Sequence, residues 1–415
     1  MIALSARTAK RELRGTHRAA PLTHSLERAR ALSAAAGVTR VANVTGLDRV
    51  GMPVVAVMRP NARSLAVSQG KGLSLEAAMV SGLMEAIESY HAEHTELPLC
   101  LESQRALSAR ATVCDVAGLP RVAGRSLHPE RAILWTSGHE LLSDAPVYVP
   151  FELVHTNFSL PLPTGSGAFV MSSNGLASGN HPSEALSHAL CELIERDAVA
   201  LFEACGGVSQ AALRVGPDSI DDVDAQQLIM RLEAAGIAYG IWDVTSDIGV
   251  PTLVCGIVDA SADPFQPLYY ATGSGCHPVR EVALLRALTE AAQCRLTYIA
   301  GARDDADGAF FARARNPERV AHMRSLLLEQ PALRRLTQLP SQWHDSLEQD
   351  VRWLLAQLAA AGLTQVIAVD LSLPQLGLPV VRAIVPGLES VRSATGYTPG
   401  ARALRQRLPA EASAR

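Results

Sequence analysis

The spacing of apolar and polar positions along the chain predicts a mixed series of helices and strands. Stretches in which apolar residues recur every three or four positions are typical of amphipathic helices, and short apolar runs between turn residues are typical of strands. The pattern predicts helices at 22–36, 73–93, 182–202, 278–302, 317–329 and 346–361. It predicts strands at 40–47, 54–58, 132–136, 147–154, 239–244, 252–259, 269–272, 365–370 and 380–385. We therefore expect a mixed α/β (α+β) fold.

Three segments share one plan, in which a strand leads through a polar turn containing glycine into a long helix rich in Ala and Leu. The expected turns are Ser68–Gly72, Ser173–Asn180 and Thr272–Gly275. The helices that follow carry Glu85-x-x-Glu88, Glu192-x-x-Glu195 and Glu290-x-x-Gln293 at comparable positions. The agreement indicates a loose pseudo-threefold repeat whose long helices pack on β-sheets. The alternative is that strand–turn–helix units are common and agree here by chance.

Composition and charge narrow the class of protein. The chain has 415 residues, 48% of them hydrophobic, which is enough to bury a large core. Its 37 Lys and Arg against 41 Asp and Glu argue against a basic nucleic-acid-binding surface. No apolar run reaches the roughly 18 residues of a spanning helix, and the basic segment Met1–Arg18 lacks the apolar middle of a secretory signal. We expect a cytoplasmic protein without nucleic-acid or membrane partners, for which a homodimer is plausible.

The cysteines do not indicate a structural scaffold. The seven are widely spaced, their number is odd, and no Cys-x-x-Cys occurs. This pattern argues against a disulfide framework and against a zinc ribbon. We expect scattered, mostly buried thiols.

The paired glutamates are the strongest chemical signal. Residues three apart share one helix face, so Glu85 projects with Glu88, and Glu192 with Glu195. Glu184 lies within about 80° of the second pair, roughly 12 Å along the same helix. That helix is otherwise apolar, and carboxylates so placed need cations between them, for which Mg²⁺ shared with phosphates fits best. The alternative is a solvated helix face, which a single pair would favour.

The glycine-containing segments fit the same chemistry. Glycines let backbone N–H groups approach a phosphate, and a following helix N-terminus favours negative charge. Neither Ser68–Gly72 nor the segment that ends at Asn180 is a Walker A motif, so each is a weak signal of phosphate binding by itself. Lys71, Arg196 and Arg295 are candidate phosphate contacts, although Arg295 is equally compatible with a surface charge. With no Gly-x-Ser-x-Gly motif and no distinctive nucleophilic Cys, the pattern favours phosphoryl transfer.

Several of these motifs together resemble the YcaO family. They are Gln69-Gly-Lys-Gly72, Glu85-Ala-Ile-Glu88, Asn174-Gly-Leu-Ala-Ser-Gly-Asn180, Glu184-Ala and Cys191-Glu-Leu-Ile-Glu195-Arg-Asp197. Weaker similarity is found at 38–53, Gln293-Cys-Arg295 and Gly301-Ala-Arg-Asp304. The resemblance covers roughly residues 15–310. It divides the chain into a lead-in and helix (1–36), a catalytic core (37–310) and a C-terminal part of the same domain (311–415).

The resemblance implies the YcaO fold, in which ATP and Mg²⁺ are held between glutamate-bearing helices. By matching motifs it implies metal binding by Glu85, Glu88, Glu184, Glu192 and Glu195. It implies nucleotide contacts from Asn180, Arg196 and Arg295, and from Arg18 and Ser25 at the N-terminal spacing of the family. Gln293 stands where the other two helices carry Glu, so it is expected to contact nucleotide rather than metal.

The family's chemistry implies activation of a backbone amide. A nucleophile adds to the carbonyl carbon, and phosphorylation of the resulting oxygen turns it into a leaving group. A Cys, Ser or Thr side chain as nucleophile gives an azoline, and sulfide gives a thioamide. Azoline-forming members typically end in Pro-x-Pro-x-Pro, whereas this chain ends Leu408-Pro-Ala-Glu-Ala-Ser-Ala-Arg415.

The segment 43–70 looks most like members paired with a TfuA protein, which are associated with thioamide formation. We therefore expect thioamidation of a peptide or protein backbone, with a TfuA-type partner, in the biosynthesis of a modified peptide natural product (RiPP) or in protein modification. An azoline-forming cyclodehydratase is the alternative.

Two rival interpretations come from other classes. Glu88-x-x-His91, with Glu184 and His188, could indicate a carboxylate-bridged di-iron site, but that site usually needs Glu-x-x-His on two helices of a bundle. A non-catalytic scaffold that binds a leader peptide is the second rival. The presence of all five glutamates weighs against it.

Overall fold

The chain forms two compact units that interleave along the sequence. The computed structural model describes residues 7–262, 269–306, 308–390 and 396–412. Unit 1 consists of Met1–Arg11, Ile87–Cys205 and His344–Arg415, and unit 2 of Glu12–Ala86 and Gly206–Trp343. Parts of the lead-in Met1–Arg18 and of the C-terminal tail therefore lie outside the described residues. The expected boundaries at residues 36 and 310 stay a prediction.

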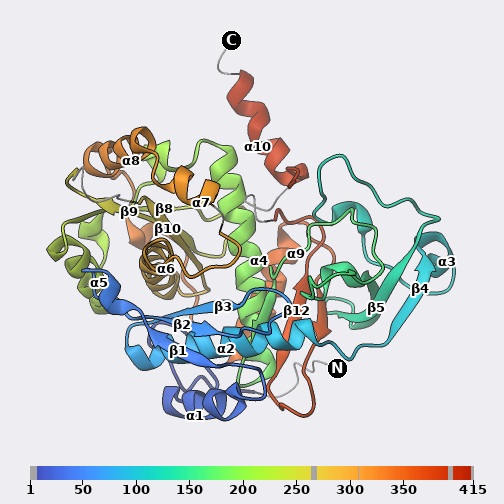
Figure 1. Ribbon diagram of the computed structural model, residues 1–415. Coiled ribbons are helices and arrows are strands. Elements are labelled where there is room, and N and C mark those ends of the chain that lie inside the picture. Colours follow the sequence, from blue (N-terminus) through green and yellow to red (C-terminus); the bar gives the residue numbers. More distant parts are fainter. Residues whose placement is uncertain (1–6, 263–268, 307, 391–395, 413–415) are drawn as a thin grey trace. The chain divides into compact units, whose positions relative to one another are not determined.

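Unit 1 is built on a six-stranded antiparallel sheet in the order β4-β5-β11-β12-β7, with β6 paired to β5 (Figure 1). The strands are β4 (Leu99–Ser103), β5 (Ala132–Glu140), β6 (Ala145–Pro150), β7 (Leu176–Ser178), β11 (Ile367–Asp370) and β12 (Val380–Ile384). The helices are α3 (Gln104–Ser108), α4 (Pro182–Ala204), α9 (Leu347–Ala360) and α10 (Ala401–Ala412). Helix α4 packs against β7, β12 and α9, so its residues are buried on most sides.

Unit 2 contains two three-stranded antiparallel sheets. One consists of β1 (Arg40–Asn43), β2 (Val54–Met58) and β3 (Val67–Lys71), and the other of β8 (Ile237–Asp243), β9 (Thr252–Asp259) and β10 (Ala271–Cys276). Its helices are α1 (Leu22–Ser33), α5 (Val223–Ala234), α6 (Arg280–Ala300), α7 (Gly308–Ala314) and α8 (Pro317–Glu329). Helix α6 lies along β9 and β10, where apolar residues of both form the main core of this unit. Helix α2 (Leu75–Glu93) begins in unit 2 and ends in unit 1.

The glycine-containing segments predicted to be turns belong largely to strands, so that prediction was wrong. Ser68–Lys71 lies within β3 and Thr272–Gly275 within β10, while the segment before α4 contains β7. Glycine is needed there for close packing. A Cβ on Gly70 would lie 2.0 Å from the Ala78 carbonyl oxygen, and one on Gly273 would lie 2.1 Å from the Ala291 nitrogen. The glycines thus let each strand lie directly against the helix that follows it.

Most predicted elements are confirmed, with differences at their ends. The strands 54–58 and 252–259 and the helix 317–329 have the predicted bounds. The predicted strand 40–47 ends at Asn43 and continues as a short 3₁₀ helix (Thr45–Leu47), and 147–154 likewise becomes 3₁₀ from Phe151. The predicted strand 269–272 begins only at Ala271. The pattern missed β3, β4, β7, α3, α5, α7 and α10, most of which are short or carry little apolar periodicity.

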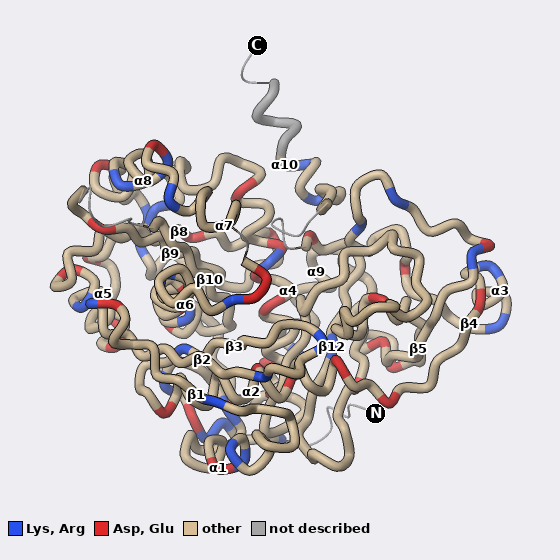
Figure 2. The backbone as a smooth tube through the Cα atoms, in the orientation of Figure 1, with Lys and Arg blue, Asp and Glu red and all other residues tan. Residues whose placement is uncertain are grey.

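The distribution of charged residues, the hydropathy of the helices and the state of the cysteines can be compared with the expectations from the sequence. Lys and Arg residues and Asp and Glu residues are interspersed along the described backbone (Figure 2). None of the described helices combines the length and hydropathy needed to cross a membrane. All seven cysteines are free thiols and four of them are buried, although Cys205 is exposed.

Candidate active site

The start of α4 is fixed by its capping residues and by a buried carboxylate. His181 is the N-cap, and its side chain accepts a hydrogen bond from the Ser183 N–H, while Pro182 occupies the first turn, where no N–H is needed. Glu184 is fully buried in that turn. The Asn180 side-chain amide donates to both of its carboxylate oxygens, at 3.2 and 3.3 Å. Two predicted site residues are thus in direct contact.

Two turns further along α4 lies the second acidic pair. Glu195 is 2% exposed and lies 3.5 Å from the guanidinium of Arg196, whereas Glu192 is half-buried. Their apolar neighbours Leu190 and Ile194 are completely buried. The helix therefore holds three carboxylates along a face that packing largely removes from water.

A buried arginine links the acidic residues of α4 to the end of α2. Arg382, on β12, is 2% exposed, and its Nε donates to the Leu153 carbonyl oxygen at 2.8 Å. Burial lowers the pKa of Arg382 to about 10, and the negative charges of Glu192 and Glu88 oppose that shift. Carboxylates from two separate stretches of sequence therefore act on the same cation within unit 1.

The acidic residues of unit 1 have the chemistry of ligands for an oxygen-coordinated divalent cation, although no three of them bring their carboxylate oxygens within 4.8 Å of one another in the described structure. Glu184 and Glu195 are buried carboxylates on a mostly apolar helix, and such groups require partners of opposite charge. Glu88 and Glu192 add two half-buried carboxylates within electrostatic reach of one point. Carboxylate oxygens are the ligands that Mg²⁺ prefers.

The remaining predicted residues of the acidic and phosphate-binding set lie in unit 2. Glu85 is exposed on α2, and its negative charge contributes to a raised pKa of Arg303, which is caused first by the hydrogen bond to Asp305. The ammonium group of Lys71 lies 2.5 Å from Oε2 of Glu290. The Gln293 side-chain amide donates to the carbonyl oxygen of Gln69 at 3.2 Å. Gln293 therefore tethers α6 to β3 next to the Lys71–Glu290 pair.

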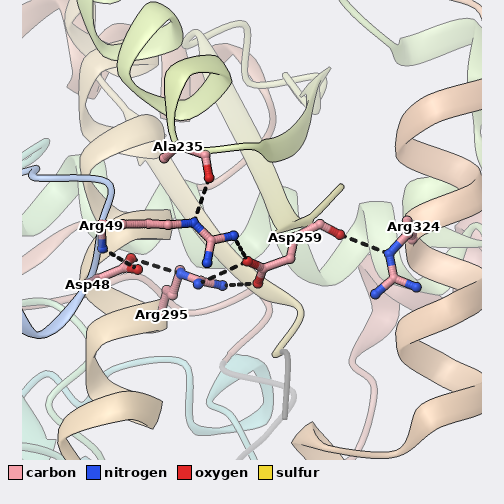
Figure 3. A network of polar contacts seen from close by, with 6 residues as sticks. All are labelled: Asp48, Arg49, Ala235, Asp259, Arg295 and Arg324. Carbon is pink, nitrogen blue, oxygen red and sulfur yellow. Dashed lines mark hydrogen bonds and ion pairs between the residues drawn. The ribbon is translucent and has the colours of Figure 1, made fainter. Parts of the chain in front are cut away.

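Arg295 stands at the centre of a buried ionic network (Figure 3). Its Nε donates to Asp48 at 2.8 Å and its Nη1 to Asp259 at 2.7 Å, and both carboxylates are almost completely buried. Arg49 pairs with the same Asp259 carboxylate, and Arg324 donates to the Asp259 carbonyl oxygen at 2.8 Å. Arg295 thus joins α6 to the end of β9 and to the loop after the first hairpin strand. Contact with a nucleotide remains a prediction for this residue.

Arg18 and Ser25 are both buried near the start of unit 2. The backbone N–H of Arg18 donates to the Glu12 carbonyl oxygen at 3.0 Å. The hydroxyl of Ser25 donates to the Pro21 carbonyl oxygen at 3.1 Å, in the first turn of α1. Their proposed contacts with nucleotide also stay predictions.

Sequence reasoning missed two arginines that support α4. Arg382 lies beside the acidic residues, and Arg402 forms a two-pronged ion pair, at 2.9 Å on each side, with the buried Asp197 of the Glu-Arg-Asp motif. The Glu389 backbone N–H donates to the same Asp197 carboxylate at 2.9 Å. Asp197 was visible in the motif, but its partners lie about two hundred residues away, where no local pattern marks them.

Comparison with known proteins identifies the family and the fold. The profile described as YcaO cyclodehydratase, ATP- and Mg²⁺-binding, matches residues 69–389. A relative from Rhizobium leguminosarum bv. trifolii, described as an uncharacterized protein in the tfuA 3′ region, is 38% identical over 361 residues, covering 85% of this chain and 84% of its own. An uncharacterized protein from Methanothermobacter thermautotrophicus is 35% identical, covering 85% and 90%.

Two solved structures share the fold. YcaO from Methanopyrus kandleri, bound with AMPPCP and Mg²⁺, has a TM-score of 0.72 and 25% identity, covering 95% of this chain and 99% of its own. A heterocyclase in complex with substrate and cofactor has a TM-score of 0.78 and 21% identity. That match covers 94% of this chain but 55% of the heterocyclase, so this chain corresponds to about half of it. The profile match, the relatives and the fold together show that this chain belongs to the YcaO family, whose cofactors are ATP and Mg²⁺.

Proposed function

We propose that this chain uses ATP and Mg²⁺ to activate a backbone amide of a peptide or protein and converts that amide into a thioamide, together with a TfuA-type partner. The observation that carries the proposal is the set of carboxylates on and near α4 in unit 1, where Glu184 and Glu195 are buried and the charges of Glu88 and Glu192 reach the buried Arg382. The thioamide branch is supported by the relative encoded in a tfuA 3′ region, which is 38% identical to this chain.

The chain's own residues would hold and orient the reactants. The five glutamates, Glu85, Glu88, Glu184, Glu192 and Glu195, are the proposed metal ligands. Asn180 holds the Glu184 carboxylate in one orientation, and Arg196 does the same for Glu195. When bound with Mg²⁺, ATP would supply the phosphoryl group that turns the amide oxygen into a leaving group. Because phosphoryl transfer depends mostly on positioning and charge stabilisation, a site of fixed carboxylates suits it.

The products and reactants balance without an oxidant or reductant. Hydrosulfide adds to the carbonyl carbon, which opens the C=O double bond and places the negative charge on oxygen. After that oxygen is phosphorylated, the C–O bond breaks, phosphate leaves with the electron pair, and loss of the sulfur-bound proton gives C=S. One oxygen is thereby exchanged for one sulfur in the substrate.

The test is mass spectrometry of a candidate peptide after incubation with this chain, a TfuA-type partner, ATP, Mg²⁺ and sulfide. We expect the mass change that replaces one oxygen by sulfur, and we expect Glu192→Ala to abolish it together with ATP turnover. Glu203→Ala is the matched control, because Glu203 is exposed on the same helix and outside the acidic cluster. Absence of both product and ATP turnover in the wild type would contradict amide activation and support a non-catalytic scaffold.

Azoline formation is the second candidate function. It is favoured by the family description as a cyclodehydratase and by the fold shared with a heterocyclase. In that case the same assay would show loss of one water from a peptide containing Cys, Ser or Thr, independent of sulfide.

A further inference from the structure

A small cavity in unit 1 lies beside the acidic helix α4. Its volume is about 40 Å³, and most of its walls are apolar, including Leu153, Val170, Leu193 and Leu388. Arg382 lines the cavity and feels the charges of Glu192 and Glu88, so the cavity lies within electrostatic reach of the candidate active site in the same unit. A cavity of this size holds one or two water-sized groups, and it is too small for a nucleotide or a peptide segment.

The buried guanidinium of Arg382 lines the cavity, and one of its nitrogens has no hydrogen-bond acceptor within the described ranges. Arg382 donates from Nε to Leu153 and from Nη2 to the Ser172 carbonyl oxygen. Its Nη1 is buried and has no hydrogen-bond partner among the residues that the structure describes. Buried donors are rarely left without an acceptor, and the charges of Glu192 and Glu88 act on this guanidinium without a hydrogen bond to Nη1.

The carboxylate of Glu389, which also lines the cavity, does not accept a hydrogen bond from Arg382 Nη1. Glu389 accepts hydrogen bonds from the Tyr397 hydroxyl and from the backbone N–H groups of Gly400 and Ala403, both at 2.8–2.9 Å. Its oxygens are therefore committed to the C-terminal segment. His155 adds no positive charge near neutral pH, because burial first, and then the charge of Arg382, lower its pKa to about 4.

A second polar group lines the same space. Oδ1 of Asn174 is buried and has no partner in the described part of the chain. A half-turn of the side-chain amide exchanges this oxygen for the NH₂ group, since the two ends have nearly the same shape. Asn174 could then present a second donor to whatever Arg382 binds.

We infer that this cavity binds a small monovalent anion at Arg382 Nη1 and that, in thioamide formation, this anion is the hydrosulfide nucleophile. The inference rests on the proposed function for the identity of the anion, but not for the existence of the site. A guanidinium with an available N–H among mostly apolar walls, beside a carboxylate whose oxygens are hydrogen-bonded elsewhere, suits a small, polarisable and weakly hydrated anion. It also gives the chain a place to hold sulfide next to the carboxylates that would hold metal and nucleotide.

The existence of the site is tested with bromide, which resembles hydrosulfide in charge and approximate size. Crystals of the full chain soaked in sodium bromide should give an anomalous peak within hydrogen-bonding distance of Arg382 Nη1. Val170→Ile adds one methylene group to the cavity wall and should remove the peak. Val147→Ile, at a buried position of the same unit outside the cavity, should keep it. A wild-type cavity without bromide would overturn the inference.

The identity of the anion is tested by kinetics. Val170→Ile should raise the KM for sulfide at least about tenfold while the Kd for AMPPCP with Mg²⁺ stays unchanged, and bromide should compete with sulfide but not with ATP. Arg382→Met should raise the same KM, with partial recovery in Arg382→Lys. Displacement of bromide by AMPPCP would assign the donor to nucleotide and contradict the inference. If bromide binds but no thioamide forms under any condition, the site stands and the proposed function fails.

Discussion

At the scale of single residues, the site is organised by buried charges whose partners are distant in sequence. Asp197 lies next to the acidic pair of α4, and its partner Arg402 comes from the far end of the chain. Burial raises the pKa of Asp197, and the hydrogen bond and charge of Arg402 oppose that shift. Removing one member of such a pair leaves an unpaired buried charge, which is costly. The pair therefore fixes α4 from the side of the C-terminal segment.

The sequence identified the residue types at the site but not their partners. The family resemblance implied separate roles for Glu184, as a metal ligand, and Asn180, as a nucleotide contact, and the structure brings the two side chains into contact. Arg295 was predicted to contact nucleotide, yet nothing local could indicate that Asp48 and Asp259 share its guanidinium. Arg382 was missed for the same reason, since it sits in an apolar strand. Ion pairs between distant segments leave no periodic signal.

His155 gives a prediction about pH. It is 2% exposed, its Nδ1 accepts a hydrogen bond from the Asn157 N–H at 3.1 Å, and its pKa is lowered to about 4. An unfolded histidine has a pKa of about 6.5. Above that value both states are neutral, and below it the unfolded state binds a proton that the folded state does not. The free energy of unfolding should therefore fall by about 2 kcal/mol from this residue between pH 7 and pH 5.

Urea unfolding at both pH values, compared between wild type and His155→Asn, measures this contribution. The variant should lose less stability on acidification than the wild type, because it has no imidazole to protonate. Equal losses in both proteins would show that His155 is protonated as easily in the folded as in the unfolded state.

At the scale of elements, the same hydrophobic pattern that located the long helices misplaced the segments before them. Residues 68–71 and 272–275 are polar and rich in glycine, which is typical of turns, and yet they form β3 and β10. They contain few of the β-branched residues that mark strands, and at Gly70 and Gly273 the neighbouring helix backbone is so close that only glycine fits. The turn propensity of these residues mattered less than their close packing on the following helix, and such packing leaves no pattern in the sequence.

Gly273→Ala tests this explanation. The added Cβ would meet the backbone of α6 at Ala291 and Ala287, so strand and helix must separate. We expect the free energy of unfolding to drop by at least about 2 kcal/mol, measured by urea unfolding. Gly46→Ala is the control in the same unit, because a Cβ there has no neighbour within 4 Å, and its change should stay within about 0.5 kcal/mol. Similar stabilities of the two variants would contradict the packing argument.

At the scale of the whole molecule, each of the two units is built from segments that are not consecutive in the sequence. Each unit has its own apolar core, made from segments on both sides of the other unit's sequence. The fold class and the family could be predicted because motifs and element types survive this interleaving. The division into two units could not, because it depends on which distant segments share a core.

Nucleotide binding offers a measure that covers the whole molecule and needs no substrate. A ligand that binds only the folded state stabilises it by about 2.7 kcal/mol at a hundred times its Kd. AMPPCP with Mg²⁺ should therefore raise the melting temperature of the wild-type chain by a few degrees, and chelating the metal should reverse the rise. Glu192→Ala should show little rise, whereas Glu203→Ala, on the exposed part of the same helix, should behave like the wild type. If Glu192→Ala were stabilised as strongly as the wild type, Glu192 would not be a ligand of the bound metal, and its closeness to Arg382 would be structural.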